Sequence, residues 1–398
     1  MITAFLLVAS ACGSASTPVA KGGPASDVRT AAASPEPSAK GGSPPPIPGV
    51  VDPSVTCVTR PTGAPMVLVG WALYEVADPI HPRLLCKIAS TATHLYTADT
   101  FAYIRRSGDG TEVVLHSIGS GNESVTAGWP LKMLVTPFGN VAAWTVDGNR
   151  AATAVEGKND AGNQTIQIWL FDETNQPKKT MLYEFLYPLT DCVCRFGLPE
   201  PVLAFSPDGE YLVSGWPIGK GFGPLRVYRV ADRTLVATVD TGEPTGLWSR
   251  TGHRLYVTAR TGIPRTWTPE DGIATLDGAS AWMHLPGLSP DGSQVVYTAF
   301  ADLDANTIVR SYVYDISAHK TRLVTDRPRS EVVFVKNGWV WYRDEQPCTS
   351  CPGPTGPTDR VFAMDFATGA ESAVVFAPGE SPAELQTGWA AAQFWPNL

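Results

Sequence analysis

The chain has 398 residues, of which 43% are hydrophobic and 10% aromatic, so it can bury one large core or two ordinary ones. Its formal net charge is −8 at pH 7, which argues against a nucleic-acid partner, because such binding depends on a basic surface that neutralises phosphates. After residue 12 no run approaches the roughly 18 consecutive apolar residues that a spanning helix needs.

An export signal is expected at the N-terminus. The apolar run of residues 2–11 leads into Ala-Ser-Ala-Cys-Gly at 9–13. This segment resembles the lipobox of bacterial lipoproteins, in which the cysteine is lipidated and becomes the mature N-terminus. The resemblance implies a lipoprotein signal peptide at 1–12 and lipid attachment at Cys12. Ala9 stands where Leu is usual and no basic residue precedes the apolar run, which leaves open an upstream start codon or an ordinary disordered terminus.

Residues 13–54 are predicted to form a disordered linker. They are almost entirely Ser, Ala, Pro, Gly and Thr with a few charges, and such a segment cannot bury enough apolar surface to fold. A coil of about forty residues spans on the order of 35 Å. We therefore expect the linker to hold a domain of residues 55–398 outside the cytoplasm, with contact to the bacterial cell membrane through the N-terminal lipid only.

The cysteines favour disulfide bonds. Of the seven cysteines, six remain after Cys12 is assigned to lipid, an even number in a chain expected to be exported. Six cysteines allow fifteen pairings, and the sequence does not choose among them. A four-thiolate zinc site is the alternative, disfavoured because one pair is separated by a single residue and the pairs lie far apart in sequence. The disulfide candidates are Cys57, Cys86, Cys192, Cys194, Cys348 and Cys351.

A four-residue turn motif recurs along the chain. Ser-Pro-Asp-Gly occupies residues 206–209 and again 289–292, an order that suits a type I turn, and apolar alternation on both sides predicts a hairpin. Aligned on the turn glycine, the repeats are 61, 43, 40 and 46 residues apart, and most of these intervals match a propeller blade. The glycines are Gly148, Gly209, Gly252, Gly292 and Gly338.

A second landmark follows each turn glycine after 23 to 27 residues, where an aspartate closes a strand and enters a turn. Two landmarks at a nearly constant offset predict repeated antiparallel sheets. The aspartates are Asp172, Asp232, Asp315 and Asp365, with Asp277 of the pair Leu276-Asp277 as the poorest match.

Two weaker blades are expected upstream of this series. Residues 101–104 with 112–115 form one candidate, and residues 66–69 with 83–86 form the other. The predicted fold class is therefore all-β, a single propeller of seven blades, with six or eight left open. Residues 390–395 are expected to close the ring by pairing with the strand near residues 66–70. A β-sandwich is the alternative, but it does not explain the period of the repeat.

The turn followed by an apolar strand, with a strand ending in Asp downstream, resembles the TolB-type propeller repeat, which is related to WD repeats and also occurs in prolyl oligopeptidases. The resemblance covers roughly residues 138–376 and implies a fold rather than a function. TolB has an α/β domain before its propeller and oligopeptidases have a hydrolase domain after theirs. We expect neither domain within residues 1–398, and we therefore transfer neither partner nor activity from these families.

The sequence carries no familiar catalytic signature. A nucleophile elbow, a phosphate loop, a His-Glu-x-x-His motif and a dinucleotide fingerprint are all missing from it. We predict no catalytic residue and no cofactor, and we interpret Asp208 and Asp291 as turn residues. The histidines are interpreted as surface or blade-edge residues rather than metal ligands, namely His81, His94, His116, His253, His284 and His319.

Two other groups are weighed as ligand sites. The alternating oxygens of Asp302, Asp304 and Asn306 are a weak calcium candidate that departs from the EF-hand pattern, so a polar turn is preferred and no metal is predicted. Trp216 and Trp267 lie where strands meet loops, and exposed aromatic residues there would form a binding surface. The tryptophans expected between blades are Trp144, Trp169, Trp248, Trp339 and Trp341.

These observations predict a lipid-anchored extracytoplasmic β-propeller of the bacterial cell envelope. Its expected function is a platform that binds a protein or another envelope ligand, and a non-enzymatic role is favoured. The alternatives are a propeller enzyme, a hydrolase or lyase, with its site at the central channel, and a carbohydrate-binding module.

Overall fold

The computed structural model describes most of the unit Ile47–Leu398. The described residues are 54–69, 71–89, 94–97, 99–107, 110–129, 135–136, 139–140, 142–145, 149–176, 178–186, 202–215, 217–218, 221–222, 224–259, 264–279, 284–300, 309–324, 329–347, 355–382, 385 and 393–395. The predicted signal peptide and residues 13–53 of the predicted linker lie outside this set.

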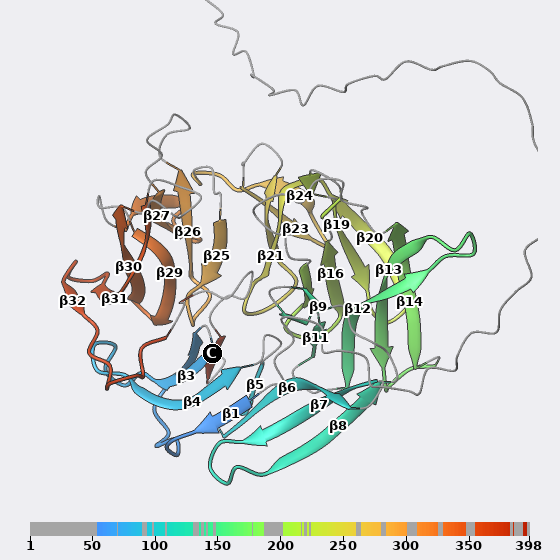
Figure 1. Cartoon of the computed structure of the whole chain (residues 1–398). Coiled ribbons are helices and arrows are strands. Elements are labelled where there is room, and N and C mark those ends of the chain that lie inside the picture. Colours follow the sequence, from blue (N-terminus) through green and yellow to red (C-terminus); the bar gives the residue numbers. More distant parts are fainter. Residues whose placement is uncertain are drawn as a thin grey trace, which may run out of the picture. The chain divides into compact units, whose positions relative to one another are not determined.

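Every regular element in the described part of the chain is a β-strand. Within that part no helix is long and apolar enough to cross a membrane. The strands form seven sheets of four or five strands, and Figure 1 shows these sheets arranged around a common centre. The protein is therefore a seven-bladed β-propeller, as the sequence predicts.

Blade 1 joins the two ends of the folded unit. Its strand order is β1-β4-β3-β2-β33, and β33 pairs antiparallel with β2, so that Trp395 lies opposite Met66 and Gln393 opposite Leu68. The predicted closure of the ring by a C-terminal strand is confirmed. The strands of blade 1 are β1 (Ser54–Cys57), β2 (Met66–Val69), β3 (Ala72–Glu75), β4 (Arg83–Ala89) and β33 (Gln393–Trp395).

The other six blades have four strands each, and each strand pairs antiparallel with the next strand of its sheet. Blade 2 consists of β5 (His94–Thr97), β6 (Thr100–Ser107), β7 (Gly110–Ser117) and β8 (Glu123–Trp129). Blade 3 consists of β11 (Ala142–Trp144), β12 (Arg150–Lys158), β13 (Gln164–Asp172) and β14 (Lys179–Leu186). Blade 4 consists of β15 (Val202–Phe205), β16 (Tyr211–Gly215), β19 (Leu225–Arg229) and β20 (Thr234–Val239).

Blades 5 to 7 complete the ring, and two short hairpins lie outside the blades. Blade 5 consists of β21 (Thr241–Trp248), β22 (Leu255–Ala259), β23 (Pro264–Thr268) and β24 (Gly272–Thr275). Blade 6 consists of β25 (His284–Leu288), β26 (Gln294–Phe300), β27 (Val309–Asp315) and β28 (Lys320–Leu323). Blade 7 consists of β29 (Arg329–Lys336), β30 (Trp339–Pro347), β31 (Thr355–Asp365) and β32 (Glu371–Ala373). The hairpins are β9 (Val135–Thr136) with β10 (Gly139–Asn140), and β17 (Pro217–Ile218) with β18 (Gly221–Phe222).

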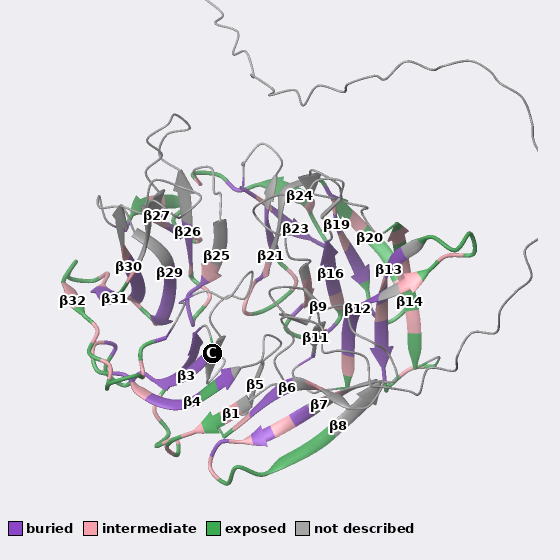
Figure 2. Cartoon of the chain, viewed as in Figure 1, coloured by how far each residue is buried: buried purple, intermediate pink, exposed green. Residues whose placement is uncertain are grey.

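The core lies between neighbouring blades. One buried cluster joins Tyr74 of blade 1 to Val333 and Trp341 of blade 7, and the Trp341 indole N–H donates to the carbonyl of Pro79 at 2.8 Å. Inner strands such as β16 are almost entirely buried, whereas outer strands such as β20 are mostly exposed, as Figure 2 shows by colour. The sequences of such buried inner strands are typically short continuous apolar runs.

The repeated turn has the geometry that its sequence predicts. The amide of Gly209 donates to the carbonyl of Ser206 at 2.8 Å, and the amide of Gly292 donates to the carbonyl of Ser289 at 2.9 Å. Both glycines have φ of +72°, a conformation that glycine tolerates better than any other residue. Gly252 and Gly338 have φ of +69° and +75° at the matching turns, whereas Gly148 lies outside the described residues.

Two sequence predictions in blade 5 are wrong. Its third strand, β23, ends at Thr268, where the Asp271 amide donates to the Thr268 hydroxyl at 3.0 Å, so Leu276-Asp277 follows the fourth strand instead. Trp267 is only 3% exposed, because its ring packs between blades 4 and 5 against Trp248 at 6.1 Å and Tyr211 at 5.4 Å. It is a core residue and not part of a binding surface.

Candidate functional site

One face of the propeller is built from two tiers of turns. In blades 2 to 7 the inner tier joins the first and second strands, and the outer tier joins the third and fourth. The tiers of one blade are tied by backbone hydrogen bonds, from Val230 to the carbonyl of Glu210 at 2.8 Å in blade 4 and from Ile316 to the carbonyl of Ser293 at 3.0 Å in blade 6. We call this side the turn face.

Side chains connect the turn of each blade to the next blade around much of the turn face. Arg150 of blade 3 donates to the carbonyl of Gly209 in blade 4 at 3.2 Å. Arg250 of blade 5 donates to the carbonyl of Ser289 in blade 6, also at 3.2 Å. Because both acceptors are backbone carbonyls, the contacts fix the positions of the turns themselves.

The links continue to the closing blade. The amide of Asp291 in blade 6 donates to Asn337 Oδ1 of blade 7 at 3.0 Å, and Lys336 Nζ of blade 7 donates to the carbonyl of Ala77 in blade 1 at 3.1 Å. Blades 3 to 7 and blade 1 are therefore connected in series on this face. A surface held in this way needs little ordering when a partner binds, which favours affinity.

The link between blades 4 and 5 is a cluster of ionisable side chains. His253 Nε2, on the turn of blade 5, contacts Asp208 Oδ2 and lies 3.4 Å from Glu210 Oε2, both on the turn of blade 4. The side chain of His253 is 23% exposed, that of Asp208 41% and that of Glu210 62%. The polar atoms lie within 4.8 Å of one another, and an imidazole with two carboxylates is a set that could hold a divalent ion such as zinc. Hydrogen bonding between the imidazole and the carboxylates accounts for the same arrangement.

Hydrogen bonds within these turns lower the pKa values of two aspartates. Burial raises the pKa of Asp208, but hydrogen bonds from the Glu210 amide, the Ser206 hydroxyl and His253 outweigh it and hold this pKa below its usual range. The same balance, with the Ser289 hydroxyl as the main donor, lowers the pKa of Asp291. The prediction that both aspartates are structural turn residues is consistent with these bonds.

Acidic side chains dominate the exposed surface of the turns in blades 4 to 6. Arg229, Arg254 and Lys320 are exposed basic residues in or directly beside these turns, and Arg229 is paired with Asp232 at 2.7 Å. Arg250 is shielded, and its burial lowers its pKa to about 10. The turn face in these blades is therefore acidic. Its exposed acidic residues are Asp208, Glu210, Asp232, Glu270, Asp271 and Asp291.

Of the predicted disulfide cysteines, two are joined. Cys57 of β1 and Cys86 of β4 lie opposite each other and form a disulfide. The remaining predicted site residues lie outside the described part of the chain, namely Cys12, Cys192, Cys194, Cys348, Cys351, Trp216, Asp302, Asp304 and Asn306.

Other predictions concern the tryptophans and histidines. Trp341 and Trp248 are buried between blades as expected, and Trp169 is half-buried. His116, expected at the surface or at a blade edge, is only 6% exposed, and its Nε2 lies 3.6 Å from Cys57 Sγ of the neighbouring blade 1. The contact between His253 and Asp208 is not evident from sequence, since the two residues are 45 positions apart. Only their matching places in consecutive repeats could have suggested it.

Comparison with known proteins shows only fold similarity. No protein-family model matches the chain, and no curated protein matches it. Among solved structures, TolB from Acinetobacter baumannii is 13% identical with a TM-score of 0.38, covering 81% of this chain and 79% of its own. A prolyl endopeptidase is 15% identical with a TM-score of 0.46, covering 82% of this chain and 50% of its own. A putative 6-phosphogluconolactonase from Bacteroides fragilis is 12% identical with a TM-score of 0.46, covering 84% of this chain and 98% of its own.

Proposed function

We propose that this protein is a lipid-anchored, extracytoplasmic β-propeller that serves as a binding platform, with the turn face of blades 4 to 6 as its binding surface. The observation that carries the proposal is the series of contacts between turns, from Arg150 to Lys336, which presents an acidic surface in one fixed arrangement. An acidic, pre-organised surface suits a protein or envelope ligand that carries basic groups.

The proposed cellular location is supported by two independent features. The small residues before Cys12 resemble a lipoprotein signal, and the segment after it has the composition of a tether. The disulfide between Cys57 and Cys86 is of the kind that persists in oxidising compartments and is rare in the cytosol. Mass spectrometry of the mature N-terminus tests the location. An unmodified peptide that runs through Cys12 in the exported protein would contradict it.

The two alternative functions have less support. Carbohydrate binding would rest on Trp216 and Trp267, and the second of these is buried. A propeller enzyme needs converging reactive groups. His253, Asp208 and Glu210 do converge, but hydrogen bonding between the imidazole and the carboxylates accounts for their arrangement, and Asp208 also accepts hydrogen bonds from its own turn. The platform is therefore the better supported function.

Charge reversal on the turn face tests the binding surface. The double substitution Glu210→Lys with Glu270→Lys reverses two exposed charges in blades 4 and 5. The matched control is Asp160→Lys, an exposed acid in the turn between β12 and β13, which lies at the opposite end of the strands. We expect cross-linked capture from cell envelopes to fall at least tenfold for the double variant and to remain unchanged for the control. Equal capture by all three proteins would contradict the proposed surface.

A further inference from the structure

The two cysteines of the disulfide between strands β1 and β4 differ in exposure. β1 stands at the end of its five-stranded sheet, and Cys57 on this strand is half-buried. Cys86, on β4, is fully buried, with 0% exposure. Cys57, on the open edge of the sheet, is therefore the cysteine of the pair that an incoming thiol can approach.

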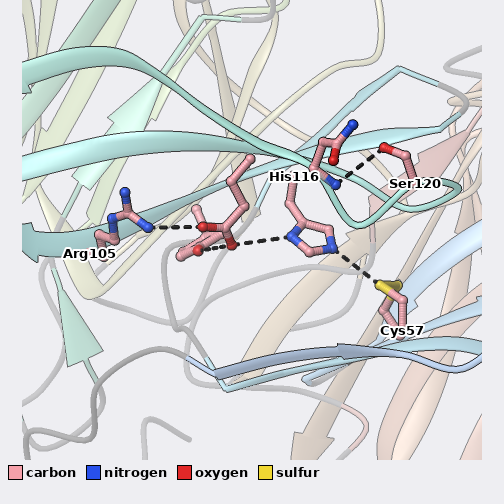
Figure 3. Close-up of polar contacts among 8 residues, drawn as sticks. Cys57, Arg105, His116 and Ser120 are labelled. Atoms are coloured by element: carbon pink, nitrogen blue, oxygen red, sulfur yellow. Dashed lines mark hydrogen bonds and ion pairs between the residues drawn. A yellow bond between two sulfur atoms is a disulfide. The ribbon is translucent and has the colours of Figure 1, made fainter.

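A buried histidine of blade 2 lies against the sulfur of Cys57. His116 Nε2 is 3.6 Å from Cys57 Sγ, and Figure 3 shows the imidazole between this sulfur and a carboxylate. That carboxylate belongs to Glu123, whose Oε1 lies 3.3 Å from His116 Nδ1. The ring also stacks on Phe101 with centroids 5.0 Å apart, so its orientation is fixed by packing as well as by hydrogen bonding.

The carboxylate behind the histidine is itself held in place. The hydroxyl of Tyr103 donates to Glu123 Oε1 at 2.5 Å, and Arg105 Nη1 donates to Oε2 at 2.9 Å. The Tyr103 hydrogen bond is the main cause of a lowered pKa for Glu123, which therefore stays ionised near neutral pH. Arg105 also donates from Nε to Glu112 Oε2 at 3.0 Å, so its guanidinium bridges the two glutamates.

This order of contacts sets the proton positions. An ionised Glu123 accepts a hydrogen bond from a proton at Nδ1 of His116, which leaves Nε2 facing the sulfur. If Cys57 is reduced, His116 Nε2 can take the thiol proton. The resulting imidazolium is stabilised by the Glu123 carboxylate, and the imidazolium in turn stabilises the Cys57 thiolate. A cationic partner of this kind lowers the pKa of a cysteine below the ordinary value of about 8.5.

We propose that the Cys57–Cys86 bond is a site of thiol–disulfide exchange, in which His116, positioned by Glu123, stabilises the Cys57 thiolate. The co-reactant is a dithiol reductant. Its first thiol loses its proton to solvent and attacks Cys57 Sγ as the thiolate, the bond between the two protein sulfurs breaks, and Cys86 leaves and takes up one proton from solvent. The second thiol then passes its proton to His116 Nε2 and attacks the reductant's own sulfur in the mixed disulfide, which releases Cys57 as a thiolate, while the reductant departs as its own disulfide.

The reduced site is expected to persist in a folded protein. Beyond Cys57, the amide of Val58 donates to the carbonyl of Leu85 at 2.8 Å, and Arg83 Nη1 donates to the Thr59 hydroxyl at 2.7 Å. These bonds hold the end of β1 without the disulfide. Lys87, which follows Cys86 in the sequence, donates a hydrogen bond to the carbonyl of Gly379. Among the described residues, the basic group that contacts the Cys57 sulfur is therefore the imidazole of His116.

The test is the pH dependence of Cys57 alkylation, measured by peptide-level mass spectrometry in the Cys86→Ser variant. Iodoacetamide is the probe, and the other cysteines are distinguished by their peptides. We expect a midpoint at least one pH unit below the ordinary value of about 8.5. Adding His116→Phe, which keeps a ring against Phe101, should return the midpoint to about 8.5 or above. Adding Ser120→Ala, a change in the nearby turn, should leave it unmoved.

A second, milder substitution keeps the proposal testable if His116→Phe fails to fold. Glu123→Gln removes the charge behind the imidazole with little change in volume, and it should move the Cys57 midpoint upward by part of the His116→Phe shift. Thermal melting checks that each variant is folded. A midpoint of about 8.5 or higher in Cys86→Ser, or one that neither His116→Phe nor Glu123→Gln moves, would overturn the proposal.

Discussion

Replacing Gly209 with Ala tests the close contact between blades 3 and 4. Gly209 has φ of +72°, and an added Cβ would lie 2.6 Å from Thr145 Cγ2. Thr145 cannot turn away freely, because its hydroxyl accepts from the Arg150 amide at 3.2 Å. The left-handed conformation costs about 1 to 2 kcal/mol for alanine. Overpacking adds roughly 1 to 3 kcal/mol, so the free energy of unfolding should fall by about 2 to 5 kcal/mol.

The matched control for this prediction is Gly252→Ala. Gly252 has nearly the same φ, +69°, but an added Cβ would meet nothing within 4 Å. The free energy of unfolding of Gly252→Ala should therefore fall only by the cost of the left-handed conformation, about 1 to 2 kcal/mol. Urea denaturation followed by tryptophan fluorescence gives the free energy of unfolding of both variants. The midpoints are compared between variants whose free energy of unfolding depends equally steeply on urea concentration. Equal midpoints for the two variants would refute the contact between blades at Gly209.

Three further predictions concern closure, pH and packing. Deleting everything after Gly388 removes β33 and should lower the free energy of unfolding by about 2 to 4 kcal/mol, whereas deleting only residues 396–398 should leave the melting temperature unchanged. Asp291 has a depressed pKa, so its stabilisation, on the order of 1 kcal/mol, is present above the unfolded pKa of about 3.9 and is lost as pH falls through the folded value. The stability difference between wild type and Asp291→Asn should thus shrink below about pH 4, and a difference that stays constant to about pH 2.5 would contradict this. Trp267→Ala should lower stability by about 3 to 5 kcal/mol if the residue is core, and calorimetry that finds no loss would reinstate it as a surface residue.

Much of the fold follows from local turn chemistry that the sequence displays directly. Ser206 to Gly209 specify a turn whose glycine needs positive φ, and this signal repeats at Gly252, Gly292 and Gly338. The closing strand was predictable because an alternating segment remained at the C-terminus with no other partner. Blade 5 departs from the pattern because β23 ends at Thr268, whose hydroxyl closes the following turn in place of an aspartate carboxylate.

The candidate sites could not be predicted in the same way, because they depend on contacts between blades. Arg250 looks like an ordinary polar turn residue, yet it donates to two carbonyls of the next blade. His116 alternates with apolar residues along β7, and no local feature shows that it faces a sulfur 59 positions away. Trp267 precedes a turn in sequence, but its side chain direction is set by the packing of blade 4. Such contacts are decided by the rotation of one sheet against the next, which sequence periodicity does not encode.

Site-specific photo-crosslinking in intact cells tests most directly whether the protein binds its partner through the turn face. A photoreactive amino acid is placed at Glu210 on the turn face or at Asp160 at the other end of the strands, both exposed positions. We predict a discrete cross-linked species from position 210 and none from position 160. Cross-linking from position 160 alone, or equally from both positions, would contradict binding through the turn face.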